Sequence, residues 1–145
     1  MKQITSTLFM LLLTAIVFGQ TATPPSEGDG TSSNPYQIET LDNLYWLSQN
    51  SGEWGKHYIQ TADIDASGTS TWDGGAGFLP IGNTTTAFSG TYDGQNHTID
   101  GLTIDRSSID FVALFGITSG ATIQNLGITN ASIVGYKKKG KTKSI

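Results

Sequence analysis

The chain has 145 residues, of which 37% are hydrophobic and 14% charged, and this allows one domain with a modest core but not two. It contains no cysteine, which excludes disulfides, a thiolate nucleophile and a cysteine metal site. All 12 acidic residues lie between Gln20 and Tyr136, together with only two of the 8 basic residues, Lys56 and Arg106. Such an acidic body disfavours nucleic acid or an anionic membrane as a partner.

The first 19 residues have the pattern of a signal peptide. Lys2 supplies a weak positive charge, residues 8–18 form an apolar run, and Gly19 suits a cleavage before Gln20. The alternative, a membrane anchor, needs roughly 18–20 apolar residues, which is more than this run provides. We therefore expect an exported protein, secreted or held at the cell surface, that does not insert into the membrane after cleavage.

Residues 20–34 are rich in Thr, Ser, Pro and Gly and predict a flexible lead-in. The folded domain is predicted over residues 35–135, and its one helix over residues 41–49, with Thr40 as N-cap. Residues 136–145 carry five lysines and are expected to be a disordered basic tail. This tail has two interpretations: a basic arm that binds anionic polymer or neighbouring acidic coils, or the product of a truncated or shifted reading frame.

After the helix, short β-branched and aromatic stretches alternate with Gly, Asp and Asn, a pattern typical of short strands joined by tight turns. The expected strands lie, in chain order, at residues 57–64, 78–81, 88–92, 97–105, 111–117 and 122–128.

An internal repeat gives the strongest indication of architecture. Residues 98–105 align with residues 122–129 at an offset of 24, and residues 59–65 form a weaker third copy. Each copy has apolar residues at i, i+3 and i+5, whereas a straight strand keeps one face inside with i, i+2 and i+4. A bend is therefore predicted at Gly101 and Asn125, two residue types that readily adopt left-handed backbone angles.

Short strands that meet at Gly or Asn corners at regular spacing are typical of a parallel β-solenoid, whose coils stack and bury their apolar residues together. We predict an all-β solenoid whose first coil is covered by the helix at residues 41–49; a β-sandwich with chance similarity between two strands is the alternative. The last coil, residues 122–134, has no recognisable cap, so we expect marginal stability or self-association through its edge.

Three stretches, Phe78–Asn83, Phe88–Ile99 and Ala113–Gly116, taken in this order, resemble the GLUG-motif proteins. These are secreted or surface-displayed bacterial repeat proteins, related to the non-catalytic regions of some adhesins and immunoglobulin A peptidases. The resemblance covers residues 29 to about 135 and implies a right-handed parallel β-helix that serves as a surface scaffold or adhesin-like module. The chain departs from the pattern by Ala113 in place of the motif's first glycine, and by about one repeat where several are usual.

No catalytic motif is present in the sequence, and the resemblance brings no catalytic residues with it, so we predict no enzyme activity and no cofactor. His57 and His97 lie 40 residues apart, without metal-ligand spacing. The acidic residues at the repeat edges leave two alternatives open, calcium binding or a solvated acidic face, and paired carboxylates also serve glycosidases. These acids are Asp63, Asp65, Asp100 and Asp105.

Trp54 and Trp72 lie in loops and are the candidate ligand-binding residues, because indole rings can stack on sugar rings. Trp72 is the better candidate for an exposed platform, and loop packing is the alternative for both. The function predicted is a non-catalytic, adhesin-like module that scaffolds or binds a glycan or protein at the cell surface. The alternative is an ancillary, carbohydrate-binding domain of a secreted enzyme that degrades polysaccharide or protein.

Overall fold

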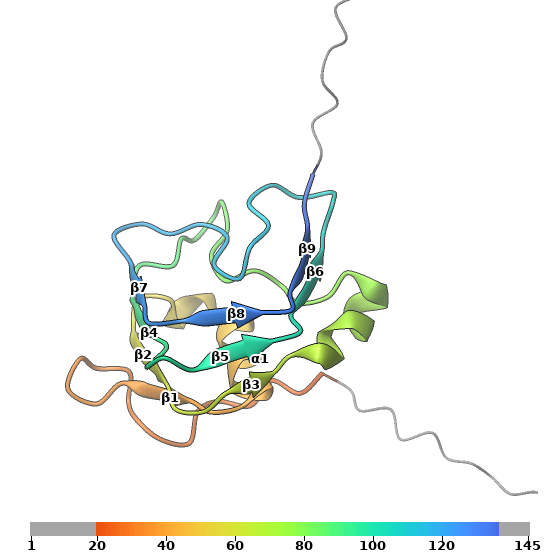
Figure 1. Cartoon of the computed structure of the whole chain (residues 1–145). Coiled ribbons are helices and arrows are strands. Elements are labelled where there is room, and N and C mark those ends of the chain that lie inside the picture. The colour runs from red at the N-terminus through yellow and green to blue at the C-terminus, as the bar shows by residue number, and fades with distance from the viewer. Residues whose placement is uncertain (1–19, 137–145) are drawn as a thin grey trace, which may run out of the picture.

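A computed structural model describes residues 20–136 of the chain (Figure 1). The predicted signal peptide, residues 1–19, and the basic tail after Tyr136 lie outside the described residues. Within the described part, no helix is both long and apolar enough to cross a membrane.

Nine short strands, one α-helix and two 3-10 helices make up the described part of the chain. The helices are α1 (Leu41–Gln49), η1 (Ser51–Glu53) and η2 (Ser67–Gly75). The strands are β1 (Tyr36–Ile38), β2 (His57–Gln60), β3 (Ile64–Asp65), β4 (Thr91–Asp93), β5 (Thr98–Asp100), β6 (Thr103–Asp105), β7 (Thr122–Gln124), β8 (Gly127–Thr129) and β9 (Ser132–Val134).

These strands form three parallel sheets, with the orders β1-β2-β4-β7, β3-β5-β8 and β6-β9. All pairings between the described strands are parallel. From β2 onward, strands that follow one another along the chain enter different sheets, and each sheet collects strands from successive passes of the chain (Figure 1). We call β2–β3 the first pass, β4–β5–β6 the second and β7–β8–β9 the third. The predicted all-β class with parallel pairing is confirmed.

The register of the passes corrects the predicted repeat. Ile99 pairs with Ile128, and Ile104 with Ile133, so the second and third passes are offset by 29 residues in these two sheets. In the remaining sheet Tyr92 pairs with Ile123, an offset of 31. The predicted offset of 24 is wrong, because it aligned the β5–β6 corner with the β7–β8 corner, and these are neighbouring corners of the path that do not stack on each other.

The stacked corners use the residue types that were expected, but in different pairs. Gly101, at the β5–β6 corner, has φ of 71°, and Asn130, at the corner above it, has φ of 49°. Asn125, with φ of 52°, lies instead above the turn at Asn96, whose amide donates to the Asn125 carbonyl at 2.8 Å. Left-handed backbone therefore recurs at the β5–β6 and β8–β9 corners and at the turns after β4 and β7. The sequence repeat indicated the residue types at these corners but not which corners stack on each other.

Helix α1 has the predicted bounds and covers the first end of the sheets. The Thr40 side chain accepts a hydrogen bond from the Asn43 amide at 3.2 Å, and the Asn43 side chain accepts one from the Thr40 amide at 3.1 Å, which closes a reciprocal cap. Leu44 and Leu47 on the inner face of the helix are fully buried. The helix thus supplies apolar cover where β1 begins the sheet.

Residues 20–34, predicted as a flexible lead-in, form backbone hydrogen bonds with the domain. The Gln37 amide donates to the Glu27 carbonyl at 3.1 Å, and the Thr23 amide donates to the Asp42 carbonyl at 3.2 Å. The first of these bonds lies along the outer edge of β1, so the lead-in covers an edge that would otherwise be open.

The expected strands at 78–81 and 111–117 are reduced to isolated bridges, and the expected strand at 88–92 forms only at its end. Ile81 bridges Phe115, and Phe88 bridges Thr118, both in the parallel sense, and Gly77 makes an antiparallel bridge to Ile104. The segments at 78–81, 88–90 and 111–117 therefore run as loops, and the part of the 88–92 prediction that forms a strand is the start of β4.

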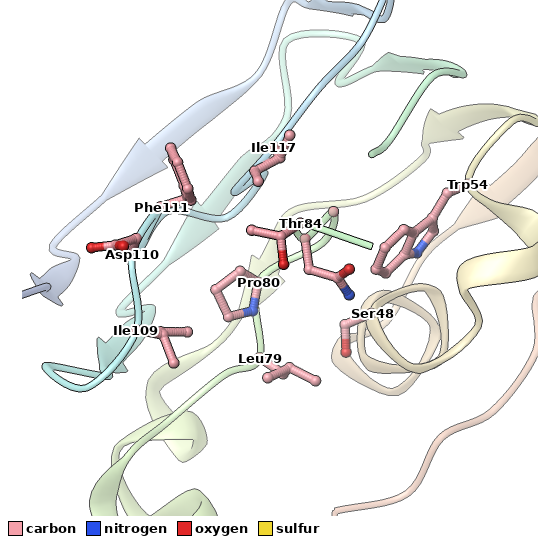
Figure 2. A pocket seen from close by; sticks show the side chains of 11 residues that line it. Ser48, Trp54, Leu79, Pro80, Thr84, Ile109, Asp110, Phe111 and Ile117 are labelled. Atoms are coloured by element: carbon pink, nitrogen blue, oxygen red, sulfur yellow. The ribbon is translucent and has the colours of Figure 1, made fainter. Parts of the chain in front are cut away.

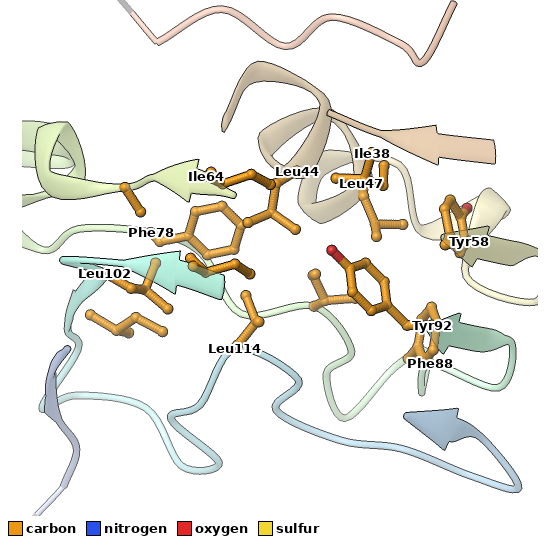
Figure 3. Close-up of a cluster of buried hydrophobic side chains, with 14 of the residues drawn as sticks. Ile38, Leu44, Leu47, Tyr58, Ile64, Phe78, Phe88, Tyr92, Leu102 and Leu114 are labelled. Carbon is orange, nitrogen blue, oxygen red and sulfur yellow. The ribbon is translucent and has the colours of Figure 1, made fainter. Parts of the chain in front are cut away.

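The same side of all three sheets contributes to a single core (Figure 3). Tyr58 and Tyr92, Ile64 and Ile99, and Ile104 are buried side chains from the first two passes. Their counterparts in the third pass, Ile123, Ile128 and Ile133, are exposed. The remaining buried core residues are Ile38, Leu44, Leu47, Trp54, Ala66, Trp72, Phe78, Ile81, Phe88, Leu102 and Leu114.

Candidate functional site

A cavity of about 350 Å³ opens beside the core, between the end of α1 and two loops (Figure 2). Trp54 and Ser48 lie on one side of it and Asp110 and Phe111 on the other, with Pro80 between them. The other lining residues are Leu79, Gly82, Asn83, Thr84, Ile109 and Ile117.

Trp54 is one of the two tryptophans predicted to bind a ligand, and it does line this cavity. Its indole ring is anchored to helix α1, because Nε1 donates a hydrogen bond of 2.7 Å to the carbonyl of Leu47 in the last turn. The Trp54 carbonyl also accepts the amides of Ser89 and Gly90, each at 2.9 Å. Trp54 is only 2% exposed, so it forms a fixed, largely buried wall of the cavity.

The opposite wall carries two apolar side chains that the core does not cover. Ile109 is 40% exposed and Phe111 is 58% exposed. Phe111 has φ of 63°, in the left-handed region where a bulky side chain is disfavoured by about 1–2 kcal/mol. Strained backbone that presents an exposed aromatic ring beside a cavity is a pattern found at binding sites.

Backbone hydrogen bonds hold the two loops of the cavity together. The Ile81 amide donates to the Leu114 carbonyl, and the Gly116 amide donates back to the Ile81 carbonyl, both at 2.8 Å. A Cβ at Gly116 would lie 2.6 Å from the Phe111 carbonyl oxygen, and one at Gly82 would lie 2.1 Å from the Ile117 carbonyl oxygen. Glycine is required at both positions because the backbones of the two loops approach each other too closely to leave room for a side chain.

Polar groups on the rim are few and mostly engaged in the fold. The Asn83 side-chain oxygen accepts the amides of Thr85 and Thr86 at 2.9 and 3.0 Å, which fixes the turn that bears Thr84. Of the described residues that line the cavity, Asp110 alone has an ionisable side chain. The cavity therefore offers apolar and aromatic surface with one carboxylate and the hydroxyls of Ser48 and Thr84.

The second predicted ligand-binding residue, Trp72, is not an exposed platform, and that expectation is wrong. It is 8% exposed and packs against Tyr45 and Phe78, with ring centroids 5.0 and 6.3 Å away. The Arg106 guanidinium fixes the end of this loop by donating hydrogen bonds to the carbonyls of Gly77 at 2.8 Å and Phe78 at 3.0 Å. Trp72 was expected to be exposed because its loop is polar and glycine-rich. Its indole ring instead packs into the core and anchors the loop there.

Sequence reasoning missed Ile109 and Phe111. Phe111 was expected to begin a strand at residues 111–117. The signal available in the sequence was the polar stretch that precedes it, Arg106 to Ser108, followed by apolar residues on either side of Asp110.

The two histidines lie away from the cavity and join neighbouring passes. His57 Nδ1 lies 2.8 Å from the Thr91 hydroxyl, and His97 Nδ1 lies 3.3 Å from an Asp63 carboxylate oxygen. Asp63 also accepts the Thr98 backbone amide at 2.8 Å, and this bond is the main cause that lowers the pKa of Asp63 below its ordinary value of 3.8.

Acidic side chains of the second pass hold the corners of the third. Asp93 accepts the side-chain amides of Gln124 at 2.8 Å and Asn125 at 3.0 Å, and Asp100 accepts Asn130 at 2.6 Å. A hydrogen bond from the Gln95 backbone amide, followed by those from Asn125 and Gln124, holds the pKa of Asp93 below 3.8. These carboxylates act as hydrogen-bond acceptors between passes.

No group of three or more His, Asp or Glu side chains within residues 20–136 is arranged to hold a metal ion. Of the acids considered for calcium, Asp63 and Asp100 bond to the next pass, and Asp65 accepts the Ser67 amide of its own turn at 2.9 Å.

The fold and the cavity thus define an all-β protein of stacked parallel strands with an aromatic-walled hollow at its side. No family model matches the chain, and no solved structure matches it. Its sequence is 43% identical over 126 residues to halomucin of Haloquadratum walsbyi. The aligned region covers 84% of this chain and 1% of halomucin. It is 36% identical over 104 residues to a protein of Evansella cellulosilytica named as a putative Gly-rich membrane protein. The aligned region covers 70% of this chain and 12% of that protein. The chain therefore spans only a small part of either relative.

Proposed function

We propose that this chain is a non-catalytic, exported module of the cell surface, adhesin-like in the sense that it presents a fixed binding surface on a rigid scaffold. In this proposal the three parallel sheets are the faces of a right-handed parallel β-helix, as the resemblance to GLUG-motif proteins implies. The observation that carries the proposal is the register of the passes, in which three successive strands of the second pass each pair with the corresponding strand of the third.

The geometry supports a helical path for three reasons. Each pass returns to the same sheet in the same direction, and connections between parallel strands of one sheet are right-handed in nearly all known cases. The stacked β5–β6 and β8–β9 corners are each two residues long and use left-handed backbone at Gly101 and Asn130. Inward side chains from all sheets meet in one core, which is how a solenoid buries its apolar residues.

A surface or extracellular location is supported by the predicted signal peptide at residues 1–19 and by the names of the two relatives, one a mucin and one a membrane protein. The test is to express the full chain in a bacterial host and to fractionate the culture. We expect the protein in the medium or on the cell surface, with its N-terminus at Gln20 by mass spectrometry. An uncleaved chain in the cytoplasm would overturn the proposal.

A second candidate function, an ancillary carbohydrate-binding domain, is favoured by the cavity itself. The cavity combines the exposed ring of Phe111, which could stack on a sugar ring, with the carboxylate of Asp110, which could accept hydrogen bonds from its hydroxyls, beside the buried wall formed by Trp54. A single carboxylate is fewer than the pair that glycoside hydrolysis uses, so the cavity suits binding better than cleavage.

A glycan array probed with the full chain tests this second candidate. We expect binding to particular glycans that is lost in Phe111→Ala and retained in Tyr136→Ala, which removes an exposed aromatic ring that does not line the cavity. No binding to any glycan, or equal loss in both variants, would leave the scaffold role and remove the carbohydrate one.

A further inference from the structure

The stack of passes ends on apolar residues that nothing covers within residues 20–136. Ile123, Ile128 and Ile133 of the third pass are 39%, 41% and 42% exposed, whereas the second-pass residues with which they pair, Tyr92, Ile99 and Ile104, are fully buried. A hollow of about 380 Å³ lies at this end and is lined by Leu114, Phe115 and Leu126 together with two of these isoleucines. We call the surface formed by β7, β8 and β9 the open end.

The strands at the open end also lack the charges that usually protect a sheet edge. In the second pass the outward positions are Asp93, Asp100 and Asp105, and the residues that pair with them in the third pass are Gln124, Thr129 and Val134. Strands β7, β8 and β9 contain no charged residue. Edge strands without charge or proline are templates for pairing with another strand, and no electrostatic repulsion opposes the approach of an identical edge.

The opposite end of the stack is closed, which restricts what a second copy can do. Leu44 and Leu47 of α1 cover the core there, and the free edge of β1 is occupied by the bond from the Gln37 amide to the Glu27 carbonyl. A head-to-tail contact between copies would need this end. The surface available to a second copy is therefore its own open end, and such a contact is isologous and stops at a dimer.

The spacing of the strands gives the symmetry axis. Two residues separate β7 from β8, and two separate β8 from β9, with Asn125 and Asn130 at the two corners. A twofold axis through β8 reverses the order of the strands, so β8 meets β8 of the second copy while β7 meets β9. Equal corners on both sides of β8 allow all three strands to find partners at once.

We propose that the open end pairs with the open end of a second copy of this chain, in antiparallel fashion about a twofold axis through β8. The pairing goes beyond the proposed surface function. It places Ile128 at the centre of the interface and covers the exposed sides of Ile123 and Ile133. It also satisfies the backbone groups along the outer edges of the third pass.

Sedimentation velocity of the full chain over a wide range of concentration is the first test. We expect a reversible monomer–dimer equilibrium without larger species. Ile128→Lys should shift the protein to monomer, since it places a charge at the centre of the contact, whereas Ser70→Lys, at an exposed position in η2, should leave the equilibrium unchanged. A wild-type monomer at all concentrations, an open-ended series of oligomers, or a dimer that persists in Ile128→Lys would overturn the proposal.

Cysteine crosslinking tests the geometry and does not depend on the lysine variant folding. The chain has no cysteine of its own, so Ile128→Cys carries a single thiol. Near the axis the two Cβ atoms of opposed residues lie about 4.5–5.5 Å apart in an antiparallel pair, a distance from which a disulfide can form. We expect a disulfide-linked dimer from Ile128→Cys on mild oxidation and none from Ser70→Cys. Equal crosslinking of the two variants, or none in Ile128→Cys, would contradict the twofold arrangement even if the chain dimerises elsewhere.

Discussion

The Tyr92 hydroxyl donates a hydrogen bond of 3.0 Å to Oε1 of Gln60 inside an otherwise apolar core, where both residues are fully buried. Gln60 Nε2 donates in turn to the carbonyls of Ala62 at 2.8 Å and Thr98 at 3.0 Å. The first pass is thus joined to the second through the core as well as along the sheet. Burial raises the pKa of the Tyr92 phenol, so it stays protonated and remains a donor at physiological pH.

We expect Tyr92→Phe to lower the free energy of unfolding by about 1–3 kcal/mol, because it leaves the buried Gln60 oxygen without a donor. Chemical denaturation measures the loss. Tyr136→Phe, at a tyrosine that is 61% exposed, is the control and should change stability by less than about 0.5 kcal/mol. The double variant Gln60→Leu with Tyr92→Phe should be more stable than the sum of the single losses predicts, and strict additivity would show that the two side chains do not act as a pair.

The corner at Gly101 gives a second prediction. Gly101 has φ of 71°, and a Cβ there would lie 3.1–3.3 Å from atoms of Ser67. Gly101→Ala should therefore cost about 1–2 kcal/mol through backbone strain alone. Thermal melting with the control Gly52→Ala checks this, since a Cβ at Gly52 meets nothing within 4 Å. Equal melting temperatures for the two variants would mean that the corner relaxes without cost.

The sequence allowed part of this fold to be predicted and concealed the rest for physical reasons. The helix at residues 41–49 was predictable because its cap and its apolar face are local features. The pairing of Gly101 with Asn130 was not, because both kinds of corner carry the same short pattern, and a pattern of eight residues does not say which copy stacks on which. Register depends on the length of the loops between passes, and no local feature encodes that length.

The site was harder to predict than the fold. Trp54 was selected for its residue type, and it lines the cavity because its indole bonds to the end of α1, a contact between residues that are close in sequence. Trp72 was selected for the same reason and is buried, because a ring in a glycine-rich loop can fold back onto the core. Phe111 was not predicted as a site residue, because whether a side chain in such a segment is buried or exposed depends on what packs against it in the folded protein.

Acid should weaken the attachment of the third pass, and Asp93 provides the third prediction. A carboxylate whose pKa is lowered on folding contributes stability that is complete above the unfolded pKa, near 3.8, and is lost as the pH falls through the lower folded value. We expect the melting temperature of the wild type to fall as the pH drops below 3.8. Asp93→Asn should show a shallower fall, because its amide does not titrate and its oxygen can still accept the hydrogen bonds from Gln95 and Asn125.

Asp105→Asn is the matched control for this pH profile. Asp105 is exposed at the end of β6, and its side chain makes no hydrogen bond among the described residues. Its replacement should leave the profile unchanged. Identical profiles for the wild type and Asp93→Asn would contradict the assigned role of Asp93 in holding the Gln124 and Asn125 side chains.

The backbone at Phe111 leads to the fourth prediction, which separates binding from stability. Alanine and glycine at this position remove the same ring, but alanine keeps the strain of a φ of 63° and glycine relieves it. Relief of about 1–2 kcal/mol exceeds the 0.5–1 kcal/mol that glycine usually loses in conformational entropy. Phe111→Gly should therefore be more stable than Phe111→Ala by about 0.5–1 kcal/mol, which reverses the usual order of the two residues.

Both variants should lose any ligand that depends on the ring, so a binding assay and a denaturation curve on the same two proteins give independent results. If Phe111→Gly is the less stable of the two, the backbone at this loop is not held in the left-handed region. If it is the more stable and still binds ligand as the wild type does, the strain is real but the ring is not part of the site. Loss of binding together with the gain in stability is the result expected of a residue held in a strained position for function.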